Sequence, residues 1–191
     1  TAGNLPRASA PLESGPLAPN HVGCGSALLG LIGFRLIYGL VGSRYARFSE
    51  FVRGPGAVID YLKSLLSGQP QRFVGHNPAG AVAIVLLLVL GLATGASGFA
   101  MYNELGGEWL EDVHEACANA MLAVVMLHVL GVIASSVLHK ENLARAMVTG
   151  RKEGSPDEGI EGRRGFFALL LAAAVAALAW SSTQTAGPAG G

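Results

Sequence analysis

The chain has 191 residues, of which 51% are hydrophobic and only 14% are charged, well below the roughly 25% that is typical of soluble domains. The formal net charge is zero, so the composition gives no reason to expect a nucleic acid or an acidic partner. Two cysteines are too few for a disulfide framework. A chain this apolar and this short is expected to bury its hydrophobic surface in lipid rather than in a large soluble core.

Four apolar stretches have about the length that a helix needs to cross a bilayer, which is about 20 residues. Helices are expected because an open sheet would leave backbone groups unpaired in lipid. The sequence therefore predicts an all-α fold, an integral membrane bundle of four transmembrane helices. In chain order, the predicted spans are about 22–43, 79–101, 116–138 and the shorter, alanine-rich 165–181.

The segments between the spans differ in charge. Lysine and arginine are concentrated in 44–78 and 139–164, whereas 102–115 has neither and carries five acidic residues. By the positive-inside rule, the two basic loops are predicted to be cytoplasmic and the acidic loop to lie on the other side of the membrane. Outside the membrane, the predicted divisions are an extracytoplasmic tail or loop at 1–20, a polar linker at 153–164 and a flexible tail at 182–191.

The first basic loop contains a helical pattern of its own. In the segment 55-PGAVIDYLKSLLSG-68, Val58, Leu62, Leu65 and Leu66 stand near helical spacing, with polar residues between them. This amphipathic pattern predicts a cytoplasmic helix. The helix either lies on the membrane surface or packs against the transmembrane bundle.

Two histidines of the third span share one helix face. His114 stands at its outer end, and His128 follows fourteen residues later, inside the apolar run. Since an α-helix turns about 100° and rises about 1.5 Å per residue, the two side chains point within about 40° of each other and lie about 21 Å apart along the axis. An ionisable residue at such a depth is costly and is taken as functional by default.

The first span repeats this spacing. His21 stands at its outer end, and Arg35 follows fourteen residues later. The first and third spans are predicted to run in the same direction, so His21 should lie at the depth of His114, and Arg35 at the depth of His128. Gly25, one turn below His21, would let a flat group approach the backbone closely.

These residues together fit a haem held between helices. Neutral imidazole can ligate iron without bringing a charge into lipid, and a guanidinium can pair with a haem propionate. The site predicted from them consists of His21, His114 and His128 as ligands of haem iron, with Arg35 and Gly25 as further contacts to the cofactor.

Single members of this set also have plainer interpretations. His21 alone would suit an interfacial residue, His128 a packing histidine or a proton relay, and the glycines helix–helix contacts. His76 precedes the second span and His139 ends the third. Both can titrate near neutral pH, so they are either surface residues or parts of a quinone or proton site.

Four motifs resemble, in their order and spacing, the bacterial and nickel-hydrogenase type of cytochrome b561. They are 34-FRLIYGLVGSRYARFSEFVRGP-55, 75-GHNPAG-80, 127-LHVLGV-132 and 135-SSVLHKENLARAMVTGRK-152, and they indicate a cytochrome b domain at 21–152. The resemblance implies a membrane protein of four or five helices that carries electrons in a respiratory chain with haem b as its cofactor. It also implies that His21 and His114 ligate the same haem.

The sequence departs from this family at its start. In the family, the histidine that matches His128 pairs with a histidine on a first helix that has no counterpart here. His128 is therefore left without an opposite ligand. We expect a truncated sequence, a ligand supplied by another subunit, or a protein that holds one haem rather than two.

The predicted function is electron transfer through haem b between the quinone pool and a redox partner: a hydrogenase, a c-type cytochrome or another dehydrogenase. Such a protein is an electron carrier or a subunit of an oxidoreductase complex rather than a stand-alone enzyme. Two other classes stay open, a non-haem membrane anchor or assembly subunit of a redox complex and a small proton-coupled transporter.

Overall fold

All the secondary structure is helical in the part of the chain that the structure, a computed structural model, describes: residues 18–69, 71–149 and a few positions between 159 and 180. Three helices are long and apolar enough to cross a membrane: Asn20–Val41, Pro78–Tyr102 and Trp109–His139. The predicted all-α fold is thus confirmed. The predicted segments 1–20, 153–164, 165–181 and 182–191, the fourth span among them, lie outside the described residues apart from a few positions.

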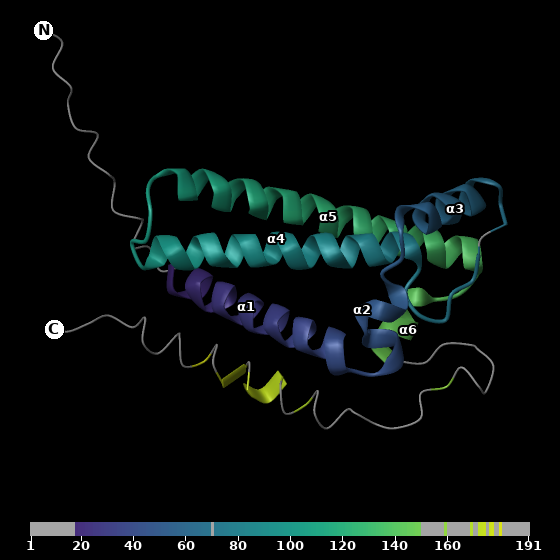
Figure 1. The fold of residues 1–191 in the computed structure, drawn as a ribbon, viewed down its shortest axis with the longest axis horizontal. Coiled ribbons are helices and arrows are strands. Elements are labelled where there is room, and N and C mark those ends of the chain that lie inside the picture. Colours follow the sequence, from purple (N-terminus) through teal and green to yellow (C-terminus); the bar gives the residue numbers. More distant parts are fainter. Residues whose placement is uncertain are drawn as a thin grey trace, which may run out of the picture.

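Helix α4 lies in the middle of the bundle, between α1 and α5 (Figure 1). The three helices are α1 (Ala18–Val41), α4 (Pro78–Tyr102) and α5 (Trp109–His139). Helices α1 and α5 run in the same direction, and α4 runs against both (Figure 1). The first and third predicted spans are therefore parallel, which is the arrangement that placing His21 beside His114 requires.

Helix α1 packs on small residues of α4. Gly91 and Gly95 are buried there, four residues apart. A Cβ atom added at Gly91 would come within 2.7 Å of Cδ1 of Ile32, and one added at Gly95 would collide with the side chain of Leu29. Glycine at both positions lets the two backbones come close, which is how helices associate where lipid provides no hydrophobic driving force.

The first residues of α4 show why the helix begins where it does. The side-chain oxygen of Asn77 accepts a hydrogen bond from the backbone N–H of Gly80 at 2.7 Å, and Pro78 is the first helical residue. Asn as N-cap satisfies a backbone donor that the helix leaves open, and Pro at the first position loses nothing. The chain is thereby turned into the membrane directly after His76.

Helix α5 begins at Trp109, several residues before the predicted span 116–138. Its first turn contains Glu111 and Asp112, whose charges are favourable at the positive end of the helix dipole. With 31 residues, α5 is about 46 Å long, whereas the hydrocarbon core of a bilayer is about 30 Å thick. The helix therefore extends beyond the apolar layer and brings His114 to its edge.

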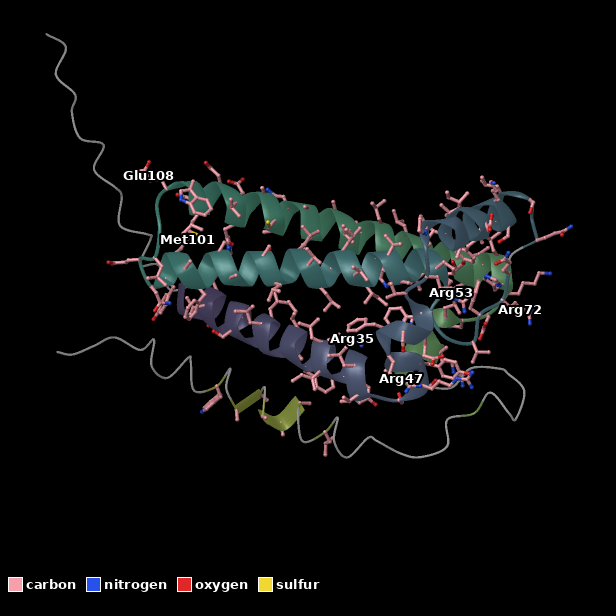
Figure 2. All side chains as sticks on the ribbon, in the orientation of Figure 1. Arg35, Arg47, Arg53, Arg72, Met101 and Glu108 are labelled. Atoms are coloured by element: carbon pink, nitrogen blue, oxygen red, sulfur yellow. The ribbon has the colours of Figure 1, made fainter. Side chains whose placement is uncertain are left out.

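The short helices gather at one end of the bundle, where α4 begins and where α1 and α5 end (Figure 1). They are η1 (Arg44–Ala46), α2 (Phe48–Phe51), α3 (Pro55–Leu66) and α6 (Leu143–Thr149). Figure 2 shows Arg35, Arg47, Arg53 and Arg72 at this end and Met101 and Glu108 at the other. We call the first the basic end, and the second, where 103–108 joins α4 to α5, the acidic end.

Helix α3 is the helix that the amphipathic pattern predicted, and its cytoplasmic location stays a prediction. Its Tyr61 is only 1% exposed, and the hydroxyl group lies 3.5 Å from Oγ of Ser135 on α5. This side of α3 is therefore packed against the bundle. Ile59, Leu62 and Leu66 on the other side are 50%, 46% and 90% exposed. The contact of this second side with a membrane surface stays a prediction.

Candidate haem site

The structure brings His21 and His114 together at the acidic end. Their ring centroids are 6.0 Å apart, and the ring planes meet at 68°. Bonds from a histidine nitrogen to a metal are about 2 Å long, so two imidazoles on opposite sides of one iron would have centroids about 6 Å apart. The separation of the two rings is therefore compatible with a shared iron. His21 comes from α1 and is exposed, and His114 comes from α5 and is half-buried.

The ring of His114 is held by α4. Its Nδ1 lies 3.0 Å from the backbone oxygen of Thr94 and 3.2 Å from Oγ of Ser97. A carbonyl oxygen can only accept, so Nδ1 carries the proton and donates it, and Nε2 of the neutral ring keeps a lone pair. Metal-ligating histidines almost always donate their other N–H to a carbonyl, a carboxylate or water in this way. His114 thus has the tautomer of an Nε2 ligand.

Glycines make room around this pair on two helices. A Cβ atom added at Gly98 of α4 would lie 3.0 Å from Cε1 of His114, so the imidazole touches the α4 backbone. One added at Gly25 of α1 would meet no atom within 4 Å. Among the described residues, the space beside α1 one turn below His21 is open. An open flank beside two facing imidazoles fits a flat macrocycle.

Arg35 lies nearer the basic end and points toward α2. Its Nη1 donates a hydrogen bond to the backbone oxygen of Ala46 at 3.0 Å. Its Cζ atom lies 5.0 Å from the ring centroid of Phe48 and 5.5 Å from that of Phe51. The guanidinium therefore fastens the loop after α1 to α1 itself. The sequence did not predict this contact of Arg35 with the loop. A further partner of Arg35 at the depth of His128 stays a prediction.

His76 sits beside Arg35, just before α4. Its ring packs against that of Phe51, with the ring centroids 4.7 Å apart and the planes tilted by 43°. Burial lowers the pKa of His76, and the charges of Arg35 and His128 lower it further, against a hydrogen bond to the Tyr45 backbone that raises it. The Nδ1 atom is buried and has no hydrogen-bond partner among the described residues. Arg35 and His76 thus both contact Phe51, and the charge of His128 acts on His76 from α5.

The other two predicted residues, His128 and His139, are not part of the His21–His114 pair. His128 is half-buried on α5, and no second histidine is paired with it as His21 is with His114 among residues 18–69 and 71–149. His139 is half-buried and is the last residue of α5, at the basic end.

Sequence reasoning missed the part that α4 plays. Thr94, Ser97 and Gly98 stand at helical spacing on one face of α4 and all meet His114. The available signal was two hydroxyl residues and a glycine three and four positions apart in an otherwise apolar span.

Comparison with known proteins identifies the family of the chain. The family model of prokaryotic cytochrome b561 matches residues 5–150. A protein of Rhizobium leguminosarum bv. viciae, named as a probable Ni/Fe-hydrogenase B-type cytochrome subunit, is 26% identical over 47% of this chain and 46% of its own length. The match therefore spans about half the length of that relative. No solved structure matches the chain significantly. Since the family model covers most of its residues, the chain belongs to the prokaryotic cytochrome b561 family, the b-type haem proteins of membrane electron transport.

Proposed function

We propose that the chain binds haem b between His21 of α1 and His114 of α5 and passes electrons between quinone and a protein partner. The observation that carries this proposal is the pair of rings 6.0 Å apart, one of them held by the Thr94 carbonyl in the tautomer of an Nε2 ligand. The bound haem supplies one-electron transfer. The chain ligates and orients it, and the apolar helices exclude water.

A second haem is proposed at the inner level, with His128 as one axial ligand and Arg35 as a partner for a propionate. The fourteen residues between His114 and His128 place it about 21 Å along α5 from the first. Two haems at that separation would cover most of a hydrocarbon layer about 30 Å thick. The ligand opposite His128 is expected from a segment outside the described residues or from another subunit.

A quinone site is proposed beside His76 at the basic end. A hydrogen bond that raises the pKa of a histidine is one in which a ring N–H donates, here to the Tyr45 backbone. The remaining nitrogen, Nδ1, is then a buried acceptor without a donor among the described residues. The hydroxyl of a quinol is a donor of the kind that this nitrogen lacks, and His76 would accept its proton on oxidation. His139 is proposed to pass that proton to solvent.

The partner is proposed to be a hydrogenase or a c-type cytochrome, and another dehydrogenase would suit the same role. The relative from Rhizobium is named as a cytochrome subunit of a Ni/Fe-hydrogenase, which supports the first choice. We place the partner at the acidic end, over 103–108, because His21 and His114 lie closest to that surface.

The test is a reduced-minus-oxidised absorption spectrum of the protein purified in detergent. We expect haem b bands, and we expect His114→Ala to lower the haem-to-protein ratio by one. Cys24→Ser is the matched control, since this exposed thiol also lies on α1, one turn from His21, and has no role in the proposed ligation of haem. Absence of haem bands in the parent protein would instead favour a non-haem anchor subunit or a transporter.

A further inference from the structure

The side of α4 that faces His114 carries two buried hydroxyl groups. Thr94 is 7% and Ser97 5% exposed, in a helix that is otherwise strongly apolar. The hydroxyl of Thr94 donates to the backbone oxygen of Leu90 at 2.8 Å and turns away from the histidine. The hydroxyl of Ser97 is the one that reaches the ring, with Oγ at 3.2 Å from Nδ1 of His114.

The direction of the Ser97 contact follows from its other partners. Oγ lies 2.8 Å from the backbone oxygen of Ala93 and 3.0 Å from that of Thr94. Both oxygens can only accept, so they take the single hydroxyl hydrogen, and the lone pairs of Oγ are left for the ring. The N–H of His114 therefore meets two acceptors, the Thr94 carbonyl and the Ser97 hydroxyl.

Two hydrogen-bond acceptors on α4 restrict the orientation of the His114 ring more than a single acceptor would. The Thr94 carbonyl alone would fix the tautomer but would let the imidazole swing about the hydrogen bond. The second acceptor, one turn along α4, fixes the plane of the ring as well. Gly98 of α4 lies directly against the ring, because a Cβ added there would be 3.2 Å from Nδ1 and 3.0 Å from Cε1 of His114.

We propose that Ser97 is a positioning residue of the His21–His114 haem, which it holds at a lower reduction potential by accepting a hydrogen bond from Nδ1 of His114. The inference rests on the proposed ligation of haem by His21 and His114. An acceptor at Nδ1 draws the proton toward itself and makes Nε2 a stronger donor to iron. A stronger donor stabilises the oxidised iron more than the reduced iron, so the potential falls.

The principal test compares Ser97→Ala with Ser135→Ala in the purified, haem-containing protein. Ser135→Ala is the matched control: it removes the hydroxyl of a similarly buried serine, 7% exposed against 5%, that lies on α5 beside Tyr61 at the basic end. We expect Ser97→Ala to raise the midpoint potential of one haem and to move the g values of its ferric EPR signal. A shift equivalent to about tenfold in the reduction equilibrium, about 59 mV for one electron, is the scale expected for one lost outer contact. Ser135→Ala should leave the potential and the EPR signal of this haem unchanged.

Ser97→Thr is the rescue variant, because threonine keeps a hydroxyl that can bond within the helix as serine does. It should restore the parent potential if the hydroxyl is what matters. The proposal is overturned if Ser97→Ala retains its haem with unchanged potential and EPR signal, or if Ser135→Ala shifts them equally.

A second measurement needs no haem. In protein labelled with ¹⁵N-histidine and freed of haem, His114 should show one tautomer with the proton on Nδ1. Ser97→Ala should keep that tautomer but broaden the signal, because the ring can then swing about its hydrogen bond to Thr94. His114→Gln identifies the resonance among the five histidines of the chain. This readout also decides the case in which Ser97→Ala loses its haem: an unaltered line width would refute the role of Ser97. A parent protein without haem bands would refute the proposed function, while the labelled protein would still report on the hydrogen bond.

Discussion

Replacing Arg35 should detach the loop at the basic end while leaving the transmembrane helices in place. The guanidinium donates to the Ala46 carbonyl at 3.0 Å and lies 5.0 and 5.5 Å from the ring centroids of Phe48 and Phe51. The ring of Phe48 itself rests on Gly39 of α1, where any Cβ would collide with it. Arg35→Leu removes the polar and cation–π contacts together and puts an apolar side chain where lipid tolerates it.

The magnitude follows from these contacts. A hydrogen bond from a charged group is worth about 1.5–3 kcal/mol, and a cation–π contact at a partly exposed site about 0.5–1 kcal/mol. One guanidinium makes all three contacts, so they do not add fully, and we expect about 2–3 kcal/mol for local opening. This corresponds to a rise of about 30- to 150-fold in the exchange rate of the α2 amides.

Hydrogen exchange measured by mass spectrometry on a peptide that covers 43–53 is the assay. The α2 amides bond only within the loop, for example from Val52 to the Phe48 oxygen at 2.9 Å, so they report its opening directly. Arg44→Ala is the control, because the contact of Arg44 with Glu50 is a 3.7 Å surface ion pair worth little. Exchange within twofold of the parent in Arg35→Leu, or an equal rise in Arg44→Ala, would refute the assignment.

Two further predictions concern pH and packing. The folded state lowers the pKa of His76 from 6.5, mainly through burial, so the folded protein binds fewer protons than the unfolded chain in acid. Above about pH 6.5, His76 should not affect the free energy of unfolding. Below that pH, the free energy of unfolding should fall by at most about 1.4 kcal/mol per pH unit. His76→Gln should remove this dependence from thermal unfolding measured at a series of pH values. Gly95→Val should force Leu29 aside at a cost of about 1–3 kcal/mol and lower the haem content measured by absorption. Gly33→Ala, whose added Cβ would meet nothing within 4 Å, should keep it, and equal losses in both variants would contradict the packing argument.

Hydropathy predicted the three described membrane helices well, because lipid requires apolar character over the whole length of a span. It predicted their ends less well. The first turn of α5, with Glu111 and Asp112, is helical although it is polar, since charge at a helix N-terminus is favourable where apolar character is not needed. The start of α4 at Pro78, with Asn77 as its N-cap, lies one residue before the predicted span 79–101.

The placing of His21 beside His114 could be reached from the sequence because it needed only helix periodicity and the relative direction of two spans. The cluster of Arg35, His76 and Phe51 could not. It depends on how a loop of irregular and short helical segments folds back on α1, and no periodic pattern encodes such a path. The equal offsets from His21 to Arg35 and from His114 to His128 predicted a level for Arg35 but not its contacts with the loop.

The helix that carries no histidine has the greatest influence on the arrangement of the two that do. Helix α4 lies between α1 and α5, and its Gly91 and Gly95 determine how closely α1 approaches. One turn further along, Ser97 and Gly98 determine how the ring of His114 is held. A displacement of α4 along its axis would therefore change the distance from His21 to His114 and the hydrogen bond at Nδ1 together. The position of α4 links the geometry of the site to its redox properties, so substitutions on α4 should alter haem content and potential in a correlated way.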